Sequence, residues 1–265
     1  MGSSSGRYSL PLEVCSMIVA CADIEVTSAL ALTSRKVLRS VDAKRYETFV
    51  VPSASVLANL CDTLCIRPKV AEILKCLVFD WKCDEIIEDP ELRSWLHQKV
   101  VDAFARATKL TRIVFAHLPP NSFVAFLEGL SNVFCSVSTI EIGSGDLSFS
   151  WDGFDAATHI KLLLSILHNV KSLKITAPVP RGLLRHLIAQ ISSADTPTFN
   201  SVVITVPLVD FGVIQEITYL EPEAKSKGIS FKNLTIMGPF IDDPYESVRV
   251  RVFCSIDPSR CTFRE

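Results

Sequence analysis

A short apolar pattern occurs seven times along the chain, and it limits the fold more than any other feature of the sequence. Each copy reads apolar-x-x-apolar-x-apolar, as in Leu110-x-x-Ile113-x-Phe115. The copies begin at residues 46, 74, 110, 137, 170, 199 and 231, so neighbouring copies start 27 to 36 residues apart. Because residues two positions apart lie on the same side of a β-strand, the pattern predicts seven strands whose fourth and sixth positions face a core.

Segments with helical periodicity lie between the seven copies. They span residues 56–64, 92–107, 123–133, 156–168, 182–191 and 213–223. A strand and a helix recurring about every thirty residues resemble the leucine-rich repeat, in an irregular form without its asparagine or cysteine after each strand. The resemblance implies an α/β solenoid, with a parallel sheet on its concave side and helices outside. The alternative is a doubly wound α/β domain, which the same alternation permits.

Two further features of the expected sheet concern its end and its solvent-facing positions. Residues 248–252 alternate strictly between valine and arginine, which is typical of a terminal edge strand.

The third and fifth positions of each copy face away from the helices, which places Arg112, Glu141 and Lys174 side by side. We take these three, with Trp151 in a loop, as candidate target-binding residues. The alternatives are a solvated charge ladder and an aromatic side chain tucked into the core.

The N-terminal residues predict a compact group of three short helices. Pro11 suits the first turn of a helix, and Val14, Met17, Ile18 and Cys21 follow at helical spacing along one face. Two more short apolar faces follow before residue 42. Such a small group rarely holds itself together, so we expect its exposed apolar surface to need a partner or the rest of the chain.

These residues also resemble the F-box, the segment that attaches substrate receptors to the adaptor subunit of cullin-RING ubiquitin ligases. The resemblance rests on three stretches in a fixed order: Leu10-Pro11-x-Glu13-Val14, residues 30–36 (LALTSRK), and Tyr46-Glu47-Thr48. Where the family often carries an aromatic residue after the basic pair, this chain has Val37. We divide the chain accordingly into a flexible N-terminus (1–7), an F-box-like segment (8–52) and a repeat domain (53–265). An N-terminal helical cap on a larger fold is the alternative.

The resemblance implies a function without catalysis. The chain would be the substrate-recognition subunit of a ubiquitin ligase, bound through the adaptor to a cullin and holding an unknown target protein on its repeat surface. The residues that the resemblance assigns to the adaptor contact are Leu10, Pro11, Glu13, Val14, Leu30 and Leu32. The alternative is a repeat scaffold for other proteins with a degenerate F-box.

Composition and motif content agree with these expectations. The net charge of −2 gives no electrostatic footprint for nucleic acid or a membrane surface. The absence of a secretory signal and of a long apolar run suggests a cytoplasmic or nuclear protein. Its nine cysteines are expected to be reduced and buried, because they lack the paired spacings of a zinc site. No nucleotide-binding or hydrolase motif is present, so we expect no catalytic residue, metal or cofactor.

Overall fold

The computed structural model describes most of the chain, in ten ranges. These are residues 11–33, 35–80, 89–117, 121–143, 154–192, 198–207, 213, 230–231, 234–240 and 243–252. Two of the candidate site residues, Leu10 and Trp151, lie outside them, as does nearly all of the helix expected over 213–223.

The chain begins with three short helices, α1 (Leu12–Cys21), α2 (Ile24–Ala31) and α3 (Arg35–Tyr46). Helix α2 starts at Asp23, whose carboxylate accepts a hydrogen bond of 2.8 Å from the backbone N–H of Val26. Helix α1 ends against Lys44, whose Nζ donates to the carbonyls of Val19 and Ala22, each at 2.7 Å. A cation at this position satisfies carbonyls that the helix leaves unpaired, so α3 fixes the end of α1.

Seven parallel strands follow in sequence order along one sheet. In that order they are β1 (Thr48–Val51), β2 (Cys76–Phe79), β3 (Arg112–Phe115), β4 (Thr139–Ile142), β5 (Ser172–Ile175), β7 (Ser201–Thr205) and β9 (Leu234–Phe240). The last strand, β10 (Asp243–Val252), pairs antiparallel with β9, which confirms the edge strand expected over 248–252. Strands β6 (Thr198–Phe199) and β8 (Ser230–Phe231) form a separate pair.

The register of the sheet confirms the sequence alignment position by position. The fourth residues of the seven copies form one row across the sheet: Phe49, Leu77, Ile113, Ile140, Leu173, Val202 and Leu234. A second feature recurs at the strand starts, where two successive backbone amides donate to the carbonyl of the residue just before the neighbouring strand. Lys75 and Cys76 donate in this way to Glu47, and Thr111 and Arg112 to Lys75.

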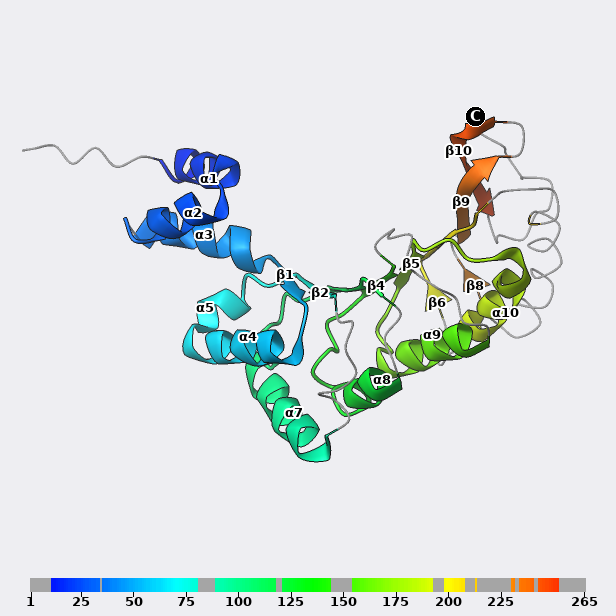
Figure 1. Cartoon of the computed structure of the whole chain (residues 1–265), viewed down its shortest axis with the longest axis horizontal. Helices are drawn as coiled ribbons and strands as arrows, with labels where there is room; N and C mark the ends of the chain where they lie inside the picture. Colours follow the sequence, from blue (N-terminus) through cyan, green and yellow to red (C-terminus); the bar gives the residue numbers. More distant parts are fainter. Residues whose placement is uncertain are drawn as a thin grey trace, which may run out of the picture.

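Helices connect the strands and lie together on one face of the sheet (Figure 1). They are α4 (Ala54–Ile66), α5 (Pro68–Ala71), α7 (Pro90–Phe104), α8 (Asn121–Glu128), α9 (Phe154–Ile166) and α10 (Arg181–Ser192). A doubly wound domain reverses its strand order and carries helices on both faces, so that alternative is wrong. Within the described ranges, no helix is both long and apolar enough to cross a membrane.

The core lies between the sheet and these helices. The fourth and sixth positions of the strands are buried, apart from the half-buried Phe49 at the edge of the sheet. Phe79 and Phe115 stack with ring centroids 5.7 Å apart, and Phe123 of α8 meets Phe79 edge-on at 5.0 Å. Because each strand contributes its core residues next to those of its neighbours, the units stabilise one another in series.

The N-terminal helices are joined directly to the sheet. One residue, Glu47, separates the end of α3 from β1, so the segment 8–52 includes the first strand of the sheet. Arg67, between α4 and α5, pairs with Asp42 of α3, whose side chain is only 12% exposed. Lys75 donates a hydrogen bond of 2.8 Å to Glu47. The Asp42–Arg67 pair joins α3 to the first repeat.

The described cysteines are all free thiols, but only half of them are buried. Cys15, Cys61 and Cys76 are buried, as the sequence predicts, whereas Cys21, Cys65 and Cys135 are exposed. The prediction of buried cysteines is therefore wrong for the second three. Cys61 and Cys65 lie one turn apart on α4. Cys61 is in the core, whereas Cys65, nearer the end of the helix, is in contact with solvent.

We expect Cys61 to react at least about a hundredfold more slowly than Cys65 with iodoacetamide at mildly alkaline pH. Burial, with the neighbouring Cys65 and Asp62, raises the pKa of the Cys61 thiol to about 12, and the thiolate is the reactive form. Peptide mapping by mass spectrometry over a time course measures both thiols in one sample. Equal rates would contradict the buried position of Cys61 in α4.

Candidate protein-interaction surfaces

The N-terminal helices carry a concentration of exposed apolar side chains. We call Val14, Met17 and Ile18 of α1, Val26 of α2 and Leu32 after α2 the N-terminal apolar face. Their exposed fractions run from 37% for Val14 to 90% for Leu32. Of the eight large apolar residues exposed in the described part of the chain, these five belong to its first 33 residues. Helices α1 and α2 lie at one end of the molecule, and α3 joins them to the sheet (Figure 1).

The packing of α1 explains why this face stays exposed. Its opposite side carries Cys15 and Val19, which are buried and lie on the side where α1 packs along α3. Val41 of α3 is likewise only 1% exposed. Among the described elements, α1 makes its main contacts with α3. Covering these side chains with a partner is favourable by about 25 cal/mol per Å² of apolar area removed from water.

The six residues assigned to the adaptor contact differ in exposure. Pro11, Glu13, Val14 and Leu32 are exposed, Leu30 is half-buried, and Leu10 lies outside the described residues. The assignment omits Met17, Ile18 and Val26. The first two lie on the same helical face as Val14, so their spacing alone could have included them.

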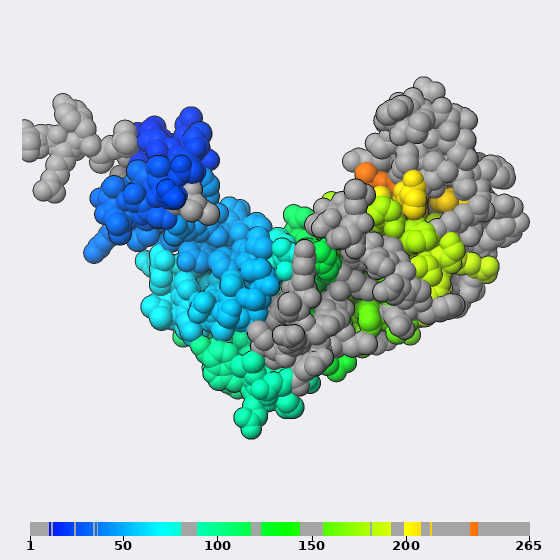
Figure 2. All heavy atoms as spheres, viewed as in Figure 1, coloured from blue at the N-terminus to red at the C-terminus, as the bar shows by residue number. Residues whose placement is uncertain are grey.

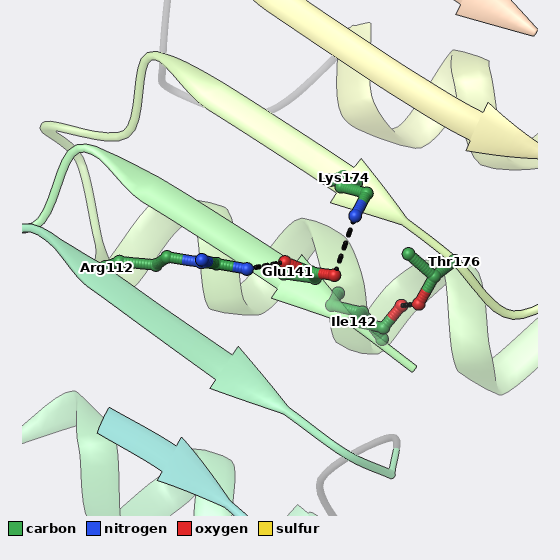
Figure 3. A network of polar contacts seen from close by, with 5 residues as sticks. All are labelled: Arg112, Glu141, Ile142, Lys174 and Thr176. Carbon is green, nitrogen blue, oxygen red and sulfur yellow. Dashed lines mark hydrogen bonds and ion pairs between the residues drawn. The ribbon is translucent and has the colours of Figure 1, made fainter. Parts of the chain in front are cut away.

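The second surface is the face of the sheet that the helices do not cover, which we call the open face. It carries the third and fifth residues of each copy. Glu141 of β4 stands at its centre between Arg112 of β3 and Lys174 of β5 (Figure 3). Lys174 is the register partner of Glu141, and its Nζ donates to Oε1 at 2.9 Å. Arg112 is opposite Thr139 and reaches Glu141 diagonally with its guanidinium.

The structure therefore brings three of the four candidate target-binding residues together. They do not form a fully solvated ladder, since Glu141 is only 9% exposed. Burial acts to raise the pKa of the Glu141 carboxyl, but hydrogen bonds from Lys174 and Arg112 outweigh it and hold the pKa below its usual value. The carboxylate stays ionised at neutral pH. The two cations remain 48% and 44% exposed, so both charges reach solvent.

One polar pair was missed by the sequence analysis. Asp80 follows β2 and His117 lies just beyond β3, and Nε2 of His117 is 3.1 Å from Oδ1 of Asp80. Neighbouring parallel strands end at the same edge of a sheet, which brings these side chains together. A carboxylate and an imidazole can transfer a proton, but no serine, threonine or cysteine of the described residues hydrogen-bonds to the pair. The described ranges also hold no cluster of three or more metal-ligating side chains.

Comparison with known proteins assigns the chain to no family. No family model matches the chain, and a search of curated proteins finds no relative. Its described residues offer two separate surfaces, an apolar one on the N-terminal helices and a charged one on the open face. Figure 2 shows the N-terminal helices at one end of the molecule, followed by the first repeats.

Proposed function

We propose that this protein is a substrate receptor of a cullin-RING ubiquitin ligase. The adaptor subunit would bind the N-terminal apolar face, and a target protein would bind the open face of the sheet. The observation that carries the proposal is the exposure of Val14, Met17, Ile18, Val26 and Leu32 within the segment that resembles an F-box. Such a receptor acts in the cytoplasm or the nucleus.

The chemistry of the N-terminal apolar face supports an apolar protein partner. Fully burying one Val, Leu, Ile or Met side chain is worth about 1.5–3 kcal/mol, and this face offers five that are more than a third exposed. Glu13, in the first turn of α1, is an exposed charged residue next to Val14 in the sequence. An apolar centre with a polar rim is the usual form of a protein interface.

The junction between the helices and the sheet supports a receptor that holds two proteins in a fixed geometry. Contacts between Asp42 and Arg67, and between Glu47 and Lys75, join α3 to the first repeat. A ligase works by proximity, because a target lysine held near the charged conjugating enzyme meets it at high effective concentration. A rigid connection preserves that distance, so the proposed chain needs no catalytic residue of its own.

The proposal includes an irregular leucine-rich-repeat fold for residues 53–265. Its support is the strand order, which follows the sequence across seven parallel strands, and the single layer of connecting helices. Repeats of this kind use their concave sheet as an extended binding surface. The alternative function is a scaffold whose F-box-like segment does not bind the adaptor. It is favoured by Val37, a half-buried residue of α3 that stands where the family often has an aromatic one.

Co-purification of the full chain with the ligase adaptor subunit tests the proposal. We expect a one-to-one complex on size exclusion. The double variant Met17→Glu, Ile18→Glu should weaken it by at least about 30-fold, the effect of losing one interface hot spot. Both side chains are exposed and glutamate is a good helix former, so the variant should keep its fold.

The matched control is Ile66→Glu, which charges a residue that is 79% exposed at the end of α4. It should bind the adaptor as the unchanged chain does, and circular dichroism should show the same thermal unfolding for all three proteins. A chain that stays monomeric with the adaptor at high concentration would refute the proposed function and leave the scaffold. Binding that the double variant does not weaken would place the adaptor on another surface.

A further inference from the structure

The open face divides into an apolar part and a charged part. The third residues of the strands form one row on it: Thr48, Cys76, Arg112, Thr139, Ser172 and Ser201. The fifth residues form a second row: Val50, Val78, Val114, Glu141, Lys174, Val203 and Thr235. The first three strands thus carry valines in the second row, of which Val50 is exposed, Val78 half-buried and Val114 buried. The charges gather on β3, β4 and β5.

The charged part carries an excess of positive charge. Arg112 and Lys174 share the single carboxylate of Glu141, so the three side chains together keep one positive charge. The contacts with Glu141 use one nitrogen of each cation. A guanidinium carries five N–H donors and an ammonium three, so most of their donors remain available. A ligand with one negative charge completes the electrostatic balance of this cluster.

The apolar part offers a contact of a different kind beside it. Val50 of β1 is 50% exposed, although it is an apolar residue in a strand. Val78, its register partner on β2, is half-buried. Neighbouring strands are about 4.8 Å apart, so Val50 on β1 lies roughly 10 Å from the strand that carries Arg112. An extended peptide spans this distance with about three residues, since each residue advances about 3.3 Å.

We infer that the open face binds an extended segment of the target protein, with an apolar side chain over Val50 and an aspartate or glutamate carboxylate at Arg112 and Lys174. The inference rests on the proposed function, which supplies the target. A carboxylate is favoured over a phosphate because its single charge matches the excess of the cluster, whereas phosphate carries nearly two. The hydroxyls of Thr139 and Ser172, which flank the charges in the first row, suit the polar backbone of such a segment.

A displayed library of random short peptides, selected on the full chain without the adaptor, tests the inference. Selected peptides should share an acidic residue about three positions from an apolar one. Each is then synthesised with its acidic residue kept, changed to the amide, or changed to phosphoserine, and binding is followed by fluorescence anisotropy. We expect the carboxylate form to bind, and the amide form to bind about five-fold more weakly.

Variants of the cluster should change the affinity of the carboxylate peptide in opposite directions. Arg112→Gln and Lys174→Gln should each raise its Kd about five-fold, and Glu141→Gln should lower it by a similar factor. The control is Lys69→Gln, an exposed cation of α5, which should leave the Kd unchanged. All four side chains tested are polar, and because Glu141 is buried, thermal unfolding checks that each variant folds.

Four results would overturn the inference: no enriched peptide, enriched peptides without an acidic residue, an affinity that the cluster variants leave unchanged, or binding of the phosphoserine form alone. These outcomes are separate from failure of the proposed function. Peptide binding needs no adaptor, and the adaptor test uses Met17 and Ile18, which lie on the N-terminal helices. Adaptor binding without peptide binding would refute only this inference. Peptide binding without adaptor binding would refute only the ligase proposal.

Discussion

Replacing Phe115 by alanine is expected to lower the free energy of unfolding by about 3–5 kcal/mol, the usual cost of removing a buried phenylalanine ring. Phe115 is 1% exposed and stands in the sixth position of β3. Its ring stacks on Phe79 of β2 and meets Phe123 of α8 edge-on at 6.1 Å. The truncation removes contacts to the preceding strand and to the covering helix, and these elements cannot close the cavity without moving the sheet.

The matched control is Ile66→Ala, which also shortens an apolar side chain. Ile66 is 79% exposed, so this change should alter the free energy of unfolding by less than about 0.5 kcal/mol. Urea unfolding followed by circular dichroism measures both variants against the unchanged chain. A loss for Phe115→Ala below about 1 kcal/mol would mean that the aromatic cluster around β2, β3 and α8 is not a packed core.

The strand register was predictable from sequence because burial imposes it. Shifting a strand by one residue would move Leu77 and Phe79 from the core to the open face, so the apolar pattern identifies the paired positions. The charge cluster was predictable for the same reason, but its contacts were not. Arg112 is long enough to pass Thr139, its register partner, and reach Glu141 on the diagonal. Which residue Arg112 contacts therefore depends on the length of its side chain and on the charges nearby.

The orientation of α1 could not be read from its sequence. Its spacing gives two apolar stripes, one of Val14, Met17 and Ile18 and one of Cys15 and Val19. The second stripe is buried and the first is exposed, although the first holds the two largest side chains, Met17 and Ile18. Only the position of α3 decides between the stripes, because a close helix pair accepts small residues at its contact.

The Asp80–His117 pair is a second feature that could not be predicted from the sequence. The two residues are separated by 37 positions, and each is a single polar residue after an apolar strand. Nothing in their spacing connects them. They meet because β2 and β3 are neighbours in register, so that the residues after Phe79 and Phe115 emerge at the same edge. Strand adjacency has to be known before such a pair can be recognised.

Replacing Gly143 by alanine is expected to destabilise the fold by roughly 2–5 kcal/mol, for two reasons that act together. Gly143 directly follows β4 and has a φ of 82°, in the left-handed region that costs other residues about 1–2 kcal/mol. A Cβ at this position would lie 2.7 Å from the Cβ and 2.8 Å from the backbone nitrogen of Ala177. Such overpacking costs about 1–3 kcal/mol more, because Ala177 follows β5 and cannot rotate away as a long side chain could.

Replacing Gly182 by alanine should have the opposite effect on the stability of the fold. Gly182 is exposed in the first turn of α10, and a Cβ there would meet nothing within 4 Å. Alanine is the better helix former, so Gly182→Ala should be neutral or stabilise the fold by up to about 1 kcal/mol. Thermal and urea unfolding of the two variants compare one chemical change in two settings. Equal effects would refute the tight turn at Gly143, and with it the close approach of the ends of β4 and β5 beside the Glu141 cluster.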